Sequence, residues 1–238
     1  MSFVFAPRSI PTVPVFEENN LHFPIHRVYC VGANYTDHVK EVGSKGRERP
    51  FFFAKPADAV VVAKKGKEVQ IPYALDTENL NLEVELVVAI GKTAPWGRII
   101  EPSEAMDYVW GFGAGVEFTR RDWQAKVRES SQPWERSKGF DFSALVSELR
   151  PIYRAPEADN MDLWLYVNNQ PRQKGNTSHM IWSIPEIISE LSTSWQLCAG
   201  DLIYTGTPAG TGPILPGQTF EGGISGVGIF KGKMGDRF

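Results

Sequence analysis

Short apolar runs separated by turn residues follow one another along most of the chain, and the clearest covers residues 82–90. This run, LEVELVVAI, is rich in β-branched residues and ends at Gly91, so it predicts a buried strand. Shorter runs of the same kind predict further strands. They cover residues 27–32, 51–54, 59–62, 112–118, 162–167 and 202–205.

Helical spacing of apolar residues is rarer along the chain. The strongest amphipathic pattern lies within residues 184–197, where Ser183 supplies a cap residue at the start. Weaker patterns predict helices at residues 102–109 and 119–128. Residues 34–41 begin with cap-type residues and predict a short helix or a helical turn. Strands therefore dominate the predicted fold, and the helices are few.

The order of these elements predicts a single domain. Residues 1–26 carry several prolines and no clear periodicity, which indicates an extended N-terminal arm. Residues 27–238 contain neither an internal repeat nor a linker, so they predict one β-rich α+β domain.

Composition and charge support a globular protein and narrow its partners. The chain has 238 residues, of which 42% are hydrophobic and 22% charged, and these are ordinary globular values. A net charge of −3 argues against nucleic acid and anionic membrane as partners, because both require a dense positive surface. No apolar run approaches the length of a membrane span, and residues 1–14 lack the pattern of a secretory signal. A cytoplasmic location is expected, and a short organellar transit peptide is the alternative.

A pair of glutamates on the clearest strand carries the first chemical signal. Glu83 and Glu85 lie two residues apart, and strand alternation places both on one face among apolar neighbours. Two like charges in such a setting are costly unless a cation neutralises them, and carboxylates suit Mg²⁺, Mn²⁺ or Ca²⁺. The alternative is a strand with one solvated polar face. Glu117, at the end of the apolar run GFGAGVEF, is the candidate third ligand, although it could simply complement a helix dipole.

Six patches, taken in order and spacing, resemble the fumarylacetoacetate hydrolase superfamily, and among its branches the bacterial-type acylpyruvate and fumarylpyruvate hydrolases. The patches are VGANYTDHVKEVG (31–43), FFFAKPADA (51–59), NLEVELVVAIGK (81–92), VEFTRRDWQ (116–124), SKGFDFSA (137–144) and GDLIYTGTPAGTGP (200–213). The resemblance runs from about residue 27 to the C-terminus. It implies a mixed β-sandwich roll with short helices, a homodimer, and Mg²⁺ or Mn²⁺ held by three carboxylates.

The resemblance also implies roles for particular residues. Metal ligands are expected at Glu83, Glu85 and Glu117, a water-activating pair at His38 and Glu41, a site lysine at Lys138, and substrate contacts at Arg121, Gln124 and Thr207. For three of these positions a plain structural explanation is also open. His38 could be a structural histidine on a short helix, Lys138 could belong to a solvated charge run with Arg136, and Thr207 could be only a turn residue.

The reaction that the resemblance implies is hydrolysis of a carbon–carbon bond in a small 2,4-dioxo acid, a ketonic substrate of acylpyruvate or fumarylpyruvate type. His38, oriented by Glu41, would act as the base, and Lys138 would stabilise developing negative charge. Small dicarboxylic or oxo acids are the expected partners. One alternative is an oxaloacetate-type decarboxylase or tautomerase, which needs the metal and Lys138 but places less demand on the base. Another is a non-catalytic family member whose site is damaged.

Departures from the family pattern bear on the substrate more than on the fold. Glu117 stands where the family usually has Asp, and it is longer by one methylene group. Ala33, in the patch Gly-Ala-Asn-Tyr, replaces a cation that could bind an acidic substrate end. His179 stands where an acidic residue is common.

Overall fold

The computed structural model describes residues 2–18, 20–37 and 48–237. In this part of the chain the strands form two sheets and a separate two-stranded pair. The larger sheet runs in the order β4-β3-β13-β7-β8-β9-β5, with β10 beside β8 and β14 beside β7. Its strands are β3 (Val28–Val31), β4 (Phe52–Lys55), β5 (Val60–Ala63), β7 (Leu80–Ile90), β8 (Val109–Arg120), β9 (Ala144–Ser147), β10 (Arg150–Pro151), β13 (Leu202–Tyr204) and β14 (Gly212–Pro213).

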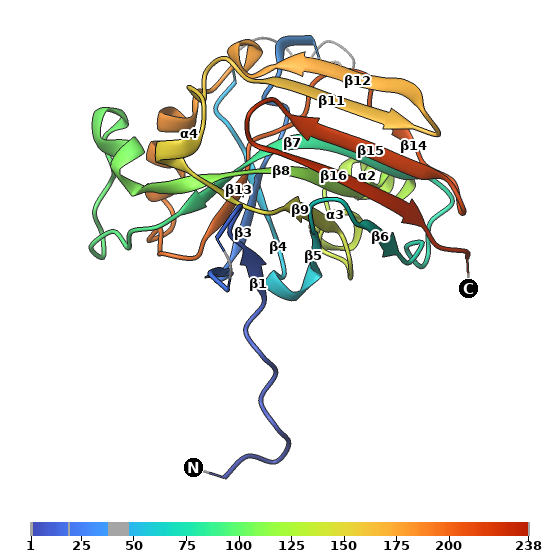
Figure 1. Cartoon of the computed structure of the whole chain (residues 1–238), viewed down its shortest axis with the longest axis horizontal. Helices are drawn as coiled ribbons and strands as arrows, with labels where there is room; N and C mark the ends of the chain where they lie inside the picture. The colour runs from blue at the N-terminus through green and yellow to red at the C-terminus, as the bar shows by residue number, and fades with distance from the viewer. Residues whose placement is uncertain (1, 19, 38–47, 238) are drawn as a thin grey trace.

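The second sheet lies as a layer against the long strands of the first: in Figure 1, β11 and β12 lie above β7 and β8, and β15 and β16 lie in front of them. Its order is β12-β11-β15-β16-β6. Its strands are β6 (Glu68–Ile71), β11 (Asp162–Val167), β12 (Gln170–Asn176), β15 (Thr219–Ile224) and β16 (Gly228–Met234). The main core fills the space between the two layers, where Val84 and Phe118 of one sheet pack in the same cluster as Leu165 and Phe230 of the other.

Short helices join the strands. The α-helices are α2 (Arg121–Glu129), α3 (Glu135–Lys138) and α4 (Ile184–Ser192), and the 3₁₀ helices are η1 (Ala57–Ala59), η2 (Pro102–Tyr108), η3 (Ile152–Arg154) and η4 (Thr177–His179). None of the helices in the described residues combines the length and the apolar character needed to cross a bilayer. The predicted β-rich α+β architecture is confirmed.

The strand predictions hold closely, whereas the helix predictions differ in type and length. The helix predicted at 102–109 is the 3₁₀ helix η2, which opens with a capping box between Glu101 and Glu104 and ends at Tyr108, because Val109 begins β8. The helix predicted at 119–128 begins only at Arg121, because Thr119 and Arg120 still pair with β7 as part of β8. The helix predicted within 184–197 ends at Ser192. Of the predicted turn at 34–41, residues 38–41 lie outside the described residues.

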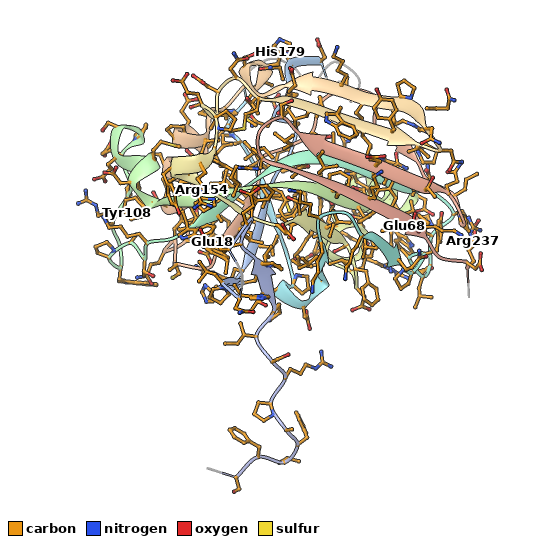
Figure 2. The ribbon with its side chains drawn as sticks, viewed as in Figure 1. Glu18, Glu68, Tyr108, Arg154, His179 and Arg237 are labelled. Atoms are coloured by element: carbon orange, nitrogen blue, oxygen red, sulfur yellow. The ribbon has the colours of Figure 1, made fainter. Side chains whose placement is uncertain are left out.

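The expected N-terminal arm is shorter than residues 1–26. Strands β1 (Thr12–Pro14) and β2 (His22–Pro24) pair antiparallel, and their side chains Val13 and Phe23 are buried in a second core cluster. An ion pair of 3.0 Å between Glu18 and Arg154, both labelled in Figure 2, joins this pair of strands to η3. Only residues before Thr12 extend away from the body (Figure 1). The prolines thus limit β1 and β2 to three residues each without preventing their packing.

Strands β7 and β8 form the centre of the larger sheet and set the position of the site. Every residue of β7 is buried, because one face packs against the second sheet and the other against the site and the second core cluster. The antiparallel register places Glu83 opposite Glu117 and Glu85 opposite Gly115. Directly opposed residues point to the same face of a sheet, so the three glutamates share one face.

Candidate metal centre and active site

The three predicted metal ligands form one buried cluster. Glu83 and Glu85 come from β7, and Glu117 comes from the neighbouring strand β8. One carboxylate oxygen from each lies within 4.8 Å of the others, a separation that oxygen ligands around one divalent ion can bridge. All three side chains are buried, so their negative charges must be balanced inside the protein.

Cations balance two of these glutamates. Lys138 Nζ, at the end of α3, lies 3.2 Å from Glu83 and donates to Glu117. Lys55 Nζ, at the end of β4, lies 2.8 Å from Glu117. The Arg121 guanidinium pairs with Glu83. The Thr119 hydroxyl lies within hydrogen-bond distance of both glutamates as well.

Glu85 differs from the other two because, among the described residues, no cation lies within ion-pair distance of it. The Gly206 backbone N–H donates to its carboxylate at 2.8 Å. Burial, together with the neighbouring charges of Glu117 and Glu83, raises the pKa of Glu85 well above its ordinary value. Burial likewise raises the pKa of Glu117, although Lys138 and Lys55 oppose this shift. An all-oxygen set in which one carboxylate has no ion-pair partner among the described residues fits a hard divalent cation.

A second group of potential ligands offers a useful contrast. His26, Cys198 and Asp201 also bring ligand atoms close together. However, Arg27 donates to both oxygens of Asp201, at 3.1 and 2.8 Å, and the Cys198 backbone N–H donates to it at 2.8 Å. These partners already satisfy the hydrogen bonds of the buried carboxylate. We therefore interpret this group as a structural contact that joins the start of β3 to the start of β13.

Gly206 holds its N–H against Glu85 in a conformation that favours glycine. Its φ is 95°, which L side chains rarely adopt, and a Cβ there would approach the Asn34 Cβ to 2.8 Å. The TGTP sequence is therefore more than a turn, since its glycine supplies a backbone donor to the carboxylate cluster.

The glutamate cluster opens into a cavity of about 220 Å³. The described side chains around it include every predicted site residue except His38 and Glu41, which lie outside the described residues. Phe51, Phe53 and Trp134 form an apolar part of the wall, and Ala33 also borders the cavity. The cavity thus combines a charged end, where the glutamates lie, with an apolar side. His179, by contrast, is exposed and labelled at the surface in Figure 2.

Lys138 is a buried cation and not part of a solvated charge run. Burial lowers the pKa of its ammonium, but the charges of Glu117 and Glu83 outweigh burial and hold the pKa above its ordinary value. The side chain therefore stays protonated near neutral pH. It can stabilise negative charge in the cavity, but it cannot serve as a general base there.

One face of α2 lines the cavity. Arg121, Gln124 and Arg128 are spaced by three and four residues, so they lie on the same side of the helix. Arg121 pairs with Glu83 and donates to Gln124. Arg128, which the sequence did not indicate, makes no ion pair with any other described residue. Arg128 therefore supplies a cation on the cavity wall. Ala33, which stands where the family pattern has a cation, supplies none.

Thr207 lies where a substrate contact was predicted, but its hydroxyl is already engaged. Thr207 Oγ1 donates to the Val84 carbonyl at 2.8 Å and accepts from Gln173 Nε2 at the same distance. Gln173 also accepts from the Val84 backbone N–H at 2.9 Å. Because the hydroxyl proton is committed, Thr207 can offer a substrate only its remaining acceptor position or its backbone.

Sequence reasoning missed Lys55, Thr119 and Gln173. Lys55 stands in the patch FFFAKPADA, at the end of a strand that carries otherwise apolar residues, and this is the signal that could have singled it out. Thr119 alternates with Glu117 on β8 and so shares its face. Gln173 gave no local signal, because its role depends on contacts with distant residues.

Comparisons with known proteins find similar sequences and structures over most of the chain. The sequence profile described as fumarylacetoacetate (FAA) hydrolase C-terminal matches residues 27–234. The fumarylpyruvate hydrolase of Pseudomonas aeruginosa, solved in complex with Mn²⁺ and pyruvate, is 38% identical with a TM-score of 0.95, and the match covers 99% of this chain and 100% of that chain. This agreement confirms the predicted fold type.

Two curated relatives carry names of a different activity. The mitochondrial oxaloacetate decarboxylase of Dictyostelium discoideum is 40% identical over 201 residues, which cover 84% of this chain and 89% of the relative. The mitochondrial oxaloacetate tautomerase FAHD1 of Bos taurus is 41% identical over 207 residues, covering 87% and 90%. Both similarities span most of each protein, as does the similarity to the hydrolase structure.

Proposed function

Because the chain belongs to the fumarylacetoacetate hydrolase family, we propose that it is a divalent-metal-dependent hydrolase of a small 2,4-dioxo acid of fumarylpyruvate type. One observation carries this proposal. Three buried carboxylates, of which Glu85 has no described cation partner, lie at one end of a cavity that also contains Lys138 and Arg121. That set of groups can hold a metal ion and an anionic oxo acid together.

Glu83, Glu85 and Glu117 would hold the ion, and Mg²⁺ or Mn²⁺ fits their oxygen atoms. When bound, the ion would supply Lewis-acid polarisation of the substrate's carboxylate and 2-oxo oxygens. The relative solved with Mn²⁺ and pyruvate supports this assignment, since pyruvate is the 2-oxo acid that hydrolysis of an acylpyruvate releases.

In the proposed reaction, the oxygen of water bonds to the 4-carbonyl carbon and the bond between C3 and C4 breaks. The electron pair of that bond moves onto C3 and the 2-oxo group as an enolate, which takes up a proton to give pyruvate. The acyl fragment leaves as a carboxylate. One proton of the water is taken up at C3, and the other is released to solvent. Lys138, held protonated beside Glu83 and Glu117, would stabilise the enolate charge.

A base must take the proton from water, and Lys138 cannot do so while it remains protonated. His38 with Glu41 is the pair predicted for this step, the carboxylate orienting the imidazole and raising its basicity. We retain this assignment as part of the proposal. The homodimer and the cytoplasmic location also remain predictions.

The cavity-lining face of α2 supports a substrate with a second, distant carboxylate. Arg121 lies beside the metal ligands, and Arg128 lies seven residues further, about 10 Å along the helix axis. Fumarylpyruvate carries its second carboxylate at the far end of its acyl chain. In oxaloacetate the second carboxylate is close to the oxo group, too near the metal end to reach Arg128.

With Mg²⁺ or Mn²⁺ present, we expect loss of the enol absorbance of fumarylpyruvate, and a higher kcat/KM for it than for acetylpyruvate. Arg128→Gln should lower kcat/KM for fumarylpyruvate about two- to fivefold, because an exposed guanidinium acts through a screened attraction. Lys126→Gln, an exposed change on the same helix outside the cavity wall, is the control. No turnover of any dioxo acid by the metal-loaded protein would refute the hydrolase assignment.

A second candidate function is tautomerisation or decarboxylation of oxaloacetate. The names of the two curated relatives, at 40% and 41% identity, favour it. The chemistry overlaps, since these reactions also stabilise an enolate of a 2-oxo acid near a cation. They differ in needing no water attack on a distal carbonyl.

Substitution of His38 by alanine separates the two candidates. We expect hydrolysis of fumarylpyruvate to fall by about 10²–10⁴-fold, the range for loss of a general base, whereas enolisation of oxaloacetate should persist. Parallel assays of both substrates with the same preparation make the comparison internal. If the wild-type protein turns over only oxaloacetate, the second candidate is correct.

A further inference from the structure

Two lysines hold Glu117, and they approach it from different sides. Lys55 Nζ lies 2.8 Å from Oε1, and Lys138 Nζ donates to Oε2. Lys138 borders the cavity, whereas Lys55 is absent from the described cavity wall and its side chain is 0% exposed. Lys55 therefore contacts the carboxylate from the protein interior.

The remaining contacts of Lys55 tie the same region together. Its ammonium donates to the Phe118 carbonyl at 3.3 Å and to the Lys138 carbonyl. Together with Glu117 Oε1, these two carbonyl oxygens provide one acceptor for each of the three N–H donors of the fully buried ammonium. One side chain thus joins the end of β4 to β8 and to the end of α3, which carries the cavity lysine.

The orientation of Glu117 follows from these contacts. The Lys138 ammonium contacts Glu83 Oε2 as well as Glu117 Oε2, so these two oxygens face a common point. Oε1 is turned toward Lys55. A glutamate has a flexible side chain, and fixing it in one rotamer before an ion binds removes an entropic cost from binding.

We propose that Lys55 is a positioning residue for the metal centre, holding Glu117 Oε1 so that Oε2 faces Glu83, and anchoring the backbone of Lys138. This inference rests on the proposed function, because it concerns the metal that the glutamates would bind. Lys55 is not among the described residues that line the cavity, and its polar contacts are with Glu117, Lys138 and the Phe118 carbonyl. Partners of this outer kind typically contribute 10–100-fold to metal affinity.

Titration of metal-stripped protein with Mn²⁺ by calorimetry tests the proposal without reference to turnover. We expect Lys55→Met to weaken Mn²⁺ binding about 10–100-fold, with the circular dichroism spectrum unchanged. Val28→Ala is the matched control, since Val28 is the cross-strand partner of Lys55 on β3 and is buried in the second core cluster. Its Mn²⁺ affinity should match that of the wild type. If Lys55→Met does not fold, Lys55→Gln replaces it.

The outcomes separate the two proposals. Wild-type protein that binds no Mn²⁺ refutes the proposed function, and the inference with it. Wild-type binding with an affinity retained within threefold in the folded Lys55 variant overturns the positioning role alone. Equal weakening in Val28→Ala also overturns it, because general packing would then explain the loss.

Discussion

Glu85→Gln should abolish metal binding and turnover while raising the thermal stability of the metal-free protein. The carboxylate is 2% exposed, faces two other glutamates and has no ion-pair partner among the described residues. Without a cation its charge destabilises the fold, so a neutral amide of the same shape should relieve that penalty. With a cation, the same carboxylate becomes a ligand whose loss removes the site.

The gain in thermal stability that Glu85→Gln should give depends on pH with a definite sign. The pKa of Glu85 is raised above its ordinary value of 4.5 by burial and by Glu117 and Glu83. The folded state therefore holds this proton more tightly than the unfolded state. The protonated Glu85 side chain contributes fully to the free energy of unfolding below about pH 4.5. This contribution is lost as the pH rises toward the raised pKa, by up to about 1.4 kcal/mol per pH unit. Glu85→Gln lacks this loss, so its advantage in Tm over wild type should grow from pH 5 upward.

Thermal unfolding measured with and without Mn²⁺ checks both parts. At a free ion concentration of 100 times Kd, the wild type should gain about 2.7 kcal/mol, or roughly 5–11 °C in Tm. Glu85→Gln should gain nothing. Glu68→Gln, a change at the exposed glutamate labelled in Figure 2, should behave as the wild type. A metal-free Glu85→Gln protein less stable than wild type would contradict the assignment of an uncompensated charge.

Lys138→Met should reduce kcat by about 10²–10³-fold, the range observed when one donor to a developing oxyanion is removed. The ammonium is buried between Glu83 and Glu117, and these charges keep it protonated. Its removal takes away the fixed positive charge of the cavity that would stabilise the enolate. The same change removes a cation that competes for two metal ligands, so Mn²⁺ should still bind.

Steady-state kinetics together with Mn²⁺ calorimetry distinguish this role from a purely structural one. A structural loss would weaken metal binding and turnover together, whereas loss of charge stabilisation lowers kcat in a metal-loaded enzyme. Lys126→Met, at an exposed position on α2, is the control for removal of a lysine. Unchanged kcat in Lys138→Met would contradict the proposed role.

Much of the site could be predicted because strand alternation is a local property. Glu83 and Glu85 share a face whatever surrounds them, and the apolar residues between them indicated a buried strand. The charge at the end of an apolar run pointed to Glu117 as a third ligand. The resemblance of ordered patches supported Glu117 and added Lys138, Arg121 and Gln124, which are far apart in sequence. The structure brings all of these to one cavity.

Several features could not be predicted because they depend on pairing between distant strands. The prolines before residue 26 indicated an extended arm, yet Val13 and Phe23 are buried, because β1 and β2 pair with each other and pack onto the domain. Thr207 was predicted as a substrate contact from position, but contacts with Val84 and Gln173 occupy its hydroxyl. His38 and Glu41 lie outside the described residues, so their roles stay predictions.

The sequence by itself determined that two carboxylates lie on one face of a buried strand, since a repeat of two residues needs no tertiary information. Only the tertiary structure decided which charges are balanced. The register of β7 and β8 brings Glu117 opposite Glu83, and the ends of β4 and α3 bring in Lys55 and Lys138. Glu85 is left without a described cation partner. Charge compensation depends on distances across the fold, which no local pattern of residues encodes.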